Sequence, residues 1–275
     1  MLLLLPIIIC IGFFYFNKKE VCTTVMLHST TNGTTVETRF PTPDGFERTN
    51  ETNASFGHFL RNLPLKKQGA LVKYYDGDSK SDDAYAAVVD LPIGSKDLHQ
   101  CADAVMRLRA DYLFKQTQFD KIHFNFTNGF RVDYVKWREG YRIAVKGNKT
   151  SWVKKQKPDY SSKAYWDYLE QIFQYAGTAS LEKELKPVND VSNIQIGDVF
   201  IKGGFPGHAV IVVDMAKNKQ GKKVFMLAQS YMPAQELQIL KNPDDAKISP
   251  WYSEDFGGTL ITPEWTFKKS QLKRF

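Results

Sequence analysis

Three residues in the sequence could together perform nucleophilic catalysis: Cys101, His208 and Gln229. A thiol with an ordinary pKa of about 8.5 is mostly protonated at neutral pH, so a catalytic cysteine needs a base or a cationic neighbour. Imidazole suits the role of base because its ordinary pKa lies near neutrality. The base in turn needs a partner on its other ring nitrogen, which an amide such as Gln229 supplies without adding charge.

The pattern around His208 predicts a β-hairpin that would bring two of these residues together. Val199 to Ile201 is a short apolar run, a glycine-rich turn follows, and Ala209 to Val213 is a continuous apolar run typical of a strand buried on both faces. A second strand is predicted to end near Tyr231. In antiparallel pairing the end of this strand lies opposite the start of its partner, so we expect Gln229 beside His208. A histidine that only caps a strand is the simpler alternative.

Cys101 lies on a predicted helix that begins at Ser95, with serine as the N-cap and Asp97 in the first turn. Apolar residues recur along it at helical spacing, which places Cys101 on the buried side about a turn and a half from the start. Two interpretations follow. Cys101 is either a small core residue, as free cysteine commonly is, or a thiolate near the positive end of a helix.

Three further residues are candidates for substrate binding. Gly207 precedes the histidine and lacks a side chain, so a backbone or a substrate could approach closely. Ser230 follows the glutamine, and Arg131 lies in an aromatic-rich region where it could line a polar groove. The aromatic residues of that region are more often core than a binding platform. No cysteine and histidine cluster has metal-ligand spacing, so we expect neither a metal nor a cofactor.

Composition limits the possible classes of protein. The chain has 275 residues, of which 43% are apolar, and this is enough for one sizeable folded domain, expected at residues 40–275. Three cysteines do not make a disulfide framework. The formal net charge is +7, but no long basic run stands out, so we do not expect nucleic acid as a partner.

The N-terminal segment indicates export. Residues 1–20 begin with an apolar run that is short for a membrane span and resembles the core of a signal, followed by lysines. We interpret it as a signal or an N-terminal membrane anchor, and the polar residues 21–39 as a linker. The protein is then expected to be periplasmic or anchored in the cell envelope, touching the membrane through this segment only.

The remaining elements are predicted from periodicity and turn residues. Helices are expected at Ser55–Leu63, Lys163–Ala176 and Thr178–Leu185. Strands are expected at Ala70–Tyr75, Ala84–Asp90 and Leu260–Phe267.

The order of these motifs resembles two groups of papain-like cysteine peptidases of bacterial envelopes, the NlpC-type endopeptidases and the CHAP amidases. Ile196–Phe200, Gly207–Ile211 and Leu227–Gln229 match the second half of that pattern. The first half departs from it, because those families place the cysteine at the very start of its helix. The resemblance implies an α+β fold with a papain-like (NlpC-type) core, in which helices pack on an antiparallel sheet.

Nearly the whole chain is similar to a bacterial envelope family known only as domain of unknown function 4846. The matching stretches are Asp97–Arg109, His123–Arg131, Gly207–Asp214, Leu227–Gln235 and Pro263–Lys268. This resemblance implies no activity.

Two functions follow as hypotheses. The first is an exported cysteine hydrolase of amide bonds, with Cys101 as nucleophile, His208 as base and Gln229 as orienting group, acting on peptidoglycan peptide or another amide substrate. The second is a non-catalytic binding or scaffold protein of the envelope on the same fold.

Overall fold

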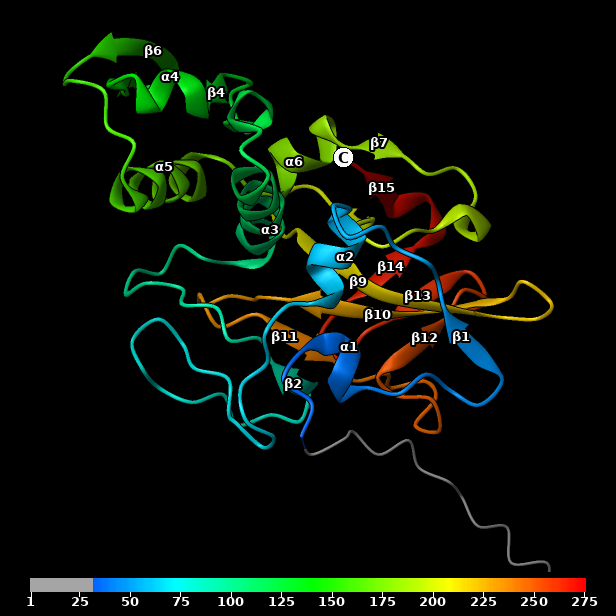
Figure 1. The fold of residues 1–275 in the computed structure, drawn as a ribbon. Coiled ribbons are helices and arrows are strands. Elements are labelled where there is room, and N and C mark those ends of the chain that lie inside the picture. Colours follow the sequence, from blue (N-terminus) through cyan, green and yellow to red (C-terminus); the bar gives the residue numbers. More distant parts are fainter. Residues whose placement is uncertain (1–31) are drawn as a thin grey trace, which may run out of the picture.

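The computed structural model describes residues 32–275 and has a mixed α+β architecture with a mostly antiparallel sheet (Figure 1). The predicted signal or anchor at residues 1–20, and the larger part of the predicted linker, lie outside the described residues. Among residues 32–275, no helix has the length and apolar character needed to cross a bilayer.

A nine-stranded sheet forms the centre of the molecule, and its main path runs β2-β11-β10-β9-β8-β15-β7. All of its pairings are antiparallel, and β1 and β12 add to β9 and β10 outside this path. The bounds are β1 Phe46–Arg48, β2 Tyr85–Val88, β7 Lys186–Pro187, β8 Val199–Lys202, β9 His208–Asn218, β10 Lys223–Gln229, β11 Gln238–Leu240, β12 Trp251–Ser253 and β15 Leu272–Arg274.

The predicted hairpin is confirmed as β9 and β10, and it forms the most deeply buried part of the sheet. Side chains of β9 alternate between two apolar clusters, as the two-residue period of a strand requires. Ala209 and Ile211 join the larger cluster with helix α3 (Cys101–Lys115), whereas Val210 and Val212 join a smaller one with β13 (Thr259–Ile261) and β14 (Thr266–Lys268). Burial on both faces explains the uninterrupted apolar run in the sequence.

The remaining elements lie around this sheet. Two short helices, α1 (Val36–Arg39) and α2 (Phe56–Arg61), pack near β9, so folded structure begins inside the segment predicted to be a linker. Figure 1 shows β3 to β6, α4 and α5 gathered together beyond α3. Their bounds are β3 His123–Asn125, β4 Arg131–Asp133, α4 Tyr134–Arg138, β5 Tyr141–Lys146, β6 Lys149–Lys154 and α5 Ser162–Tyr175, followed by α6 Thr178–Glu184; short 3₁₀ turns cover Phe119–Lys121, Val191–Asn193 and Lys269–Gln271.

Most of the predicted elements are present, but three predictions were wrong. The helix expected from Ser95 begins at Cys101 instead. The expected strand at Ala70–Tyr75 is a loop that makes only isolated bridges, through Lys73 and Tyr74. The single strand expected at Leu260–Phe267 is a tight hairpin of β13 and β14, because the backbone turns at residues 262–265.

A buried ion cluster ties the N-terminal elements to β9. Asp214 is fully buried, and its carboxylate accepts hydrogen bonds from Arg48 Nε at 2.8 Å and Arg61 Nε at 2.6 Å. The backbone N–H of Met215 donates to the same carboxylate at 2.8 Å. Buried charges are tolerated when they are paired and hydrogen-bonded in this way.

We predict that Asp214→Ala lowers the free energy of unfolding by about 3–5 kcal/mol, because it leaves the buried guanidinium of Arg61 without a counter-charge. Urea denaturation monitored by circular dichroism measures this change. The control is Asp255→Ala, which breaks the exposed pair with Lys222 and should leave stability unchanged within error. Equal stabilities of the two variants would contradict the structural role of this cluster.

Candidate active site

Cys101 is the first residue of α3, so it lies at the positive end of the helix and not a turn and a half inside it. The N-terminal cap differs from the expected one. The backbone N–H of Gln100 donates to Asp103 Oδ2 at 3.0 Å. Asp97 is engaged elsewhere, because its carboxylate accepts from the backbone N–H of Ala234 at 2.7 Å. This tertiary contact keeps residues 95–100 out of the helix.

Ser230, the residue that follows β10, holds the start of α3 in place from the other side. Ser230 Oγ lies 2.8 Å from the carbonyl oxygen of His99 and 2.6 Å from that of Gln235, and its single proton can serve one of them at a time. Ser230 is fully buried and uses its hydroxyl internally. Its contact with His99, two residues before Cys101, positions the cysteine relative to the end of the hairpin.

His208 begins β9 and is almost fully buried among aromatic rings. Its ring centroid lies 4.7 Å from that of Tyr231, 5.4 Å from that of Trp265 and 6.0 Å from that of Phe267. His208 Nε2 lies 2.8 Å from Gln229 Oε1, at the end of β10, so the expected pairing of these two residues is present. Because a carbonyl oxygen only accepts, Nε2 is the donor and Nδ1 is the nitrogen left as a base.

The thiol of Cys101 lies at the same end of β9. Backbone N–H groups of Ala102, of Ala209 and of Cys101 itself favour its ionised form, and Ala209 is the residue that follows His208. Cys101 is 8% exposed and is part of neither apolar cluster of the described residues. No hydrogen bond joins its sulfur to the His208 ring among residues 32–275, which is common before substrate binds.

Both groups are neutral at rest. Burial, with the charge of Asp103 as a second cause, raises the pKa of the Cys101 thiol to about 11. Burial lowers the pKa of His208 to about 4; the hydrogen bond that Nε2 donates to Gln229 opposes this shift, and the charge of Lys80 reinforces it. The resting site is therefore a thiol and a free imidazole base and not a thiolate–imidazolium pair.

Sequence reasoning missed two residues of the site. Gln229 Nε2 donates to Glu264 Oε2 at 2.5 Å, and Glu264 is bound by Lys80 Nζ, which lies 2.7 and 2.8 Å from its two oxygens. Lys80 is 2% exposed. Glu264 does belong to the stretch Pro263–Lys268 that carried the family resemblance, whereas Lys80 lies in the loop before β2, beyond the segment predicted as a strand, and gave no signal.

Gly207 has a close-packing role in the structure. A Cβ on this residue would lie 2.3 Å from Thr178 Oγ1 and 2.6 Å from the carbonyl oxygens of Lys202 and Gly204. The space beside Gly207 is thus filled by Thr178 and by backbone carbonyls, so the close approach expected at this glycine is made by the protein's own chain, and a contact with substrate stays a prediction. The absence of a side chain lets the turn pack against the start of α6.

Arg131 does not join the candidate site. It lies in β4, is exposed, and pairs with Asp133 of the same strand at 2.7 Å. No contact connects it to Cys101, His208 or Gln229 among the described residues.

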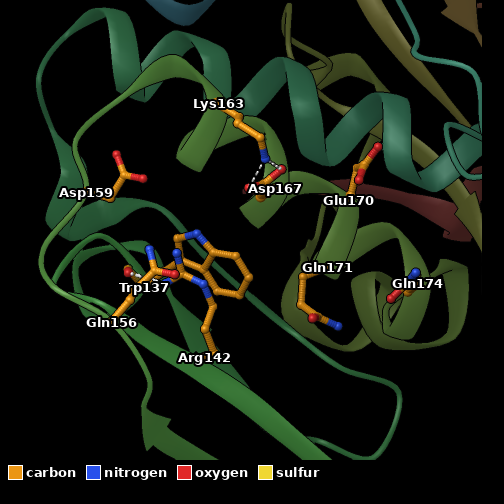
Figure 2. Close-up of a pocket in the computed structure, with 9 residues that line it drawn as sticks. All are labelled: Trp137, Arg142, Gln156, Asp159, Lys163, Asp167, Glu170, Gln171 and Gln174. Carbon is orange, nitrogen blue, oxygen red and sulfur yellow. Dashed lines mark hydrogen bonds and ion pairs between the residues drawn. The ribbon is translucent and has the colours of Figure 1, made fainter.

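Two pockets are relevant to ligand binding. One of about 490 Å³ is lined by Lys202, Glu264 and Trp265 with their neighbours in the β13–β14 turn, and so adjoins the His208 network. Figure 2 shows another, of about 470 Å³, beside α5, where Lys163 pairs with Asp167. There the Arg142 guanidinium covers the Trp137 ring at 4.0 Å and donates to backbone carbonyls, and none of the predicted site residues lines this pocket.

Comparisons with known proteins place the chain in a family without assigning an activity. The model of the family described as "Domain of unknown function (4846)" matches residues 36–274, so the chain belongs to this family. No curated protein and no solved structure matched the chain. Within residues 32–275, no group of three or more histidine, cysteine, aspartate or glutamate side chains is arranged to hold a metal ion.

His99, beside the site, is fully buried and neither of its ring nitrogens has a hydrogen-bond partner in the described part of the chain. Its ring contacts that of Phe173 edge-on at 5.7 Å. Burial, and then the charge of Arg107, lower the pKa of His99 to about 3. The imidazole thus stays neutral in the folded protein at a pH where the unfolded chain protonates it.

We predict that His99→Leu makes stability less sensitive to acid. Below about pH 6.5 the unfolded wild type gains a proton on His99 that the folded protein does not accept until about pH 3. Between pH 7 and pH 5, the wild type should therefore lose about 2 kcal/mol more of its free energy of unfolding than the variant does. Urea denaturation at both pH values tests this, and equal losses would show that His99 titrates normally.

Proposed function

We propose that this member of the domain of unknown function 4846 family is a cysteine hydrolase of amide bonds with a papain-like core. The observation that carries the proposal is the placement of a cysteine, a histidine and a glutamine on three neighbouring elements. Cys101 begins α3, His208 begins the strand on which α3 packs, and Gln229 ends the next strand and binds the imidazole at 2.8 Å.

The first half of the reaction forms an acyl-enzyme. His208 Nδ1 accepts the thiol proton as Cys101 Sγ attacks the carbonyl carbon of the substrate, and the amide oxygen takes on the negative charge. The tetrahedral intermediate then expels the amine, which receives the proton from the imidazolium, and a thioester remains. In the second half, His208 takes a proton from water, which attacks the thioester, and the acid product and the free thiol are released.

Backbone N–H groups support both charged species in this sequence. Those of Cys101 and Ala102 lie at the start of α3, where the helix leaves them unpaired and its dipole is positive. Ala209 adds an N–H group from the strand. These donors stabilise a thiolate and can serve as an oxyanion hole for the intermediate.

The position of Cys101 at the start of α3 answers the main argument against its assignment as the nucleophile. The resemblance to NlpC-type and CHAP enzymes was weakest where Cys101 seemed to lie deep inside a helix, and the helix in fact begins at that residue. The substrate we propose is a peptide amide of the cell wall, reached after export through residues 1–20. The exposed apolar side chains of Phe205 (90%) and Met232 (54%), on the loops next to His208 and Gln229, offer contact surface for such a chain.

A non-catalytic binding or scaffold protein is the second candidate. The low exposure of the site favours this candidate, because Cys101 and His208 are only 8% and 1% exposed. The pKa of the Cys101 thiol, raised to about 11, also favours an unreactive cysteine. In this alternative the cysteine is inert and the polar network only stabilises the fold. Catalysis, by contrast, requires that substrate displaces a covering side chain and brings Sγ and Nδ1 together.

We predict that Cys101→Ala and His208→Ala each lower amide hydrolysis at least about a thousandfold, because nucleophile and base act as a unit. The assay incubates the protein with cell-wall stem peptides and measures released fragments by mass spectrometry. The control Arg142→Ala, in the pocket of Figure 2, should retain full activity. Hydrolysis that survives in Cys101→Ala would remove this cysteine from the mechanism. No hydrolysis by the wild type and no acyl adduct on its cysteine would favour the scaffold alternative.

A further inference from the structure

A chain of hydrogen bonds extends behind the imidazole through three segments far apart in the sequence. It runs from Lys80 in a loop, to Glu264 in the β13–β14 turn, to Gln229 at the end of β10, and to His208. Each heavy-atom separation is between 2.5 and 2.8 Å. Buried polar chains of this kind are favourable only when every member is satisfied.

The charge at the far end fixes the direction of every bond. The Lys80 ammonium only donates, and it has Glu264, Gln235 Oε1 at 3.1 Å and Asp82 Oδ2 at 3.3 Å around it. In its ion pair with Lys80, the Glu264 carboxylate accepts hydrogen bonds and donates none. Glu264 can therefore be bound by the NH₂ group of Gln229 but not by its carbonyl oxygen.

The orientation of the Gln229 amide determines which ring nitrogen of His208 carries the hydrogen. With its NH₂ group on Glu264, Gln229 must present Oε1 to His208. The ring nitrogen that faces Oε1 is Nε2, which must carry the hydrogen to donate this bond. A flipped amide would place two acceptors together at Glu264 and would stabilise the opposite tautomer of the ring. Without Glu264, Gln229 is a neutral amide that could point either way.

We propose that Glu264, held in place by Lys80, is a positioning residue that orients the Gln229 amide and thereby keeps His208 in its Nε2–H tautomer. Nδ1 is then the ring nitrogen that can accept a proton, at the start of β9. The inference rests on the proposed function for the purpose of that base, but the tautomer itself can be measured without any substrate.

The experiment is long-range ¹H–¹⁵N NMR of the histidine rings in the full chain, which distinguishes Nε2–H from Nδ1–H by nitrogen chemical shift. In the wild type we expect His208 to be Nε2–H. The wild-type spectrum is already decisive, since a His208 that carries its proton on Nδ1 overturns the proposal whatever the variants do.

The variant that tests the role of the carboxylate is Glu264→Gln combined with Lys80→Met. The double change removes both charges, so that no unpaired buried ammonium is left to unfold the protein. We expect the ratio of Nε2–H to Nδ1–H to fall at least about tenfold, the factor that one charge-assisted hydrogen bond supplies. An unchanged ratio would refute the positioning role.

A matched control separates this effect from general loss of an ion pair. Glu236→Gln removes another half-buried Lys–Glu pair, with Lys66 at 2.5 Å, that does not touch Gln229. Its His208 tautomer should equal that of the wild type, and a shift as large as in the double variant would also refute the proposal. Failure of the proposed function looks different: the tautomer pattern holds as expected, yet the wild type hydrolyses no amide.

Discussion

The packing of helix α3 on strand β9 is the contact on which the rest of the structure depends. Ala102 and Val105 of the helix share one apolar cluster with Ala209 and Ile211 of the strand. Because the other face of β9 is covered by a second cluster, the strand cannot shift without exposing apolar side chains to water. The first residues of both elements are therefore fixed at the same end, and these residues are Cys101 and His208.

Polar side chains then determine what this end of the molecule can do. Asp97 and Ser230 tie the start of α3 to the loop after β10, and Gln229 binds the imidazole from the neighbouring strand. Here the buried ammonium of Lys80 and two hydrogen-bonding side chains, Glu264 and Gln229, lead to one ring nitrogen of His208. Such a network costs desolvation energy, and its satisfied geometry keeps the base in one state.

The sequence predicted the hairpin and the contact between His208 and Gln229 because both depend on local patterns. A strand buried on both faces is an uninterrupted apolar run, and antiparallel pairing alone places Gln229 near His208. The start of α3 could not be predicted in the same way. Ser95 and Asp97 form a good local cap, but a contact with Ala234, 137 residues further along, uses the aspartate elsewhere. The contacts of Lys80 and Glu264 with the site could not be predicted for the same reason, since only the folded chain brings these two residues to Gln229.

The most direct test of whether His208 activates Cys101 is the pH dependence of Cys101 alkylation by iodoacetamide. The rate of alkylation is measured by intact-protein mass in the wild type and in His208→Ala. With the pKa of the imidazole near 4 and that of the thiol near 11, base-assisted reaction predicts a plateau in the wild-type rate between about pH 5 and pH 9. Over this range the rate of His208→Ala should be at least about tenfold lower and should rise steadily with pH. Identical profiles in the two proteins, both rising only toward pH 11, would show that the histidine does not activate the cysteine.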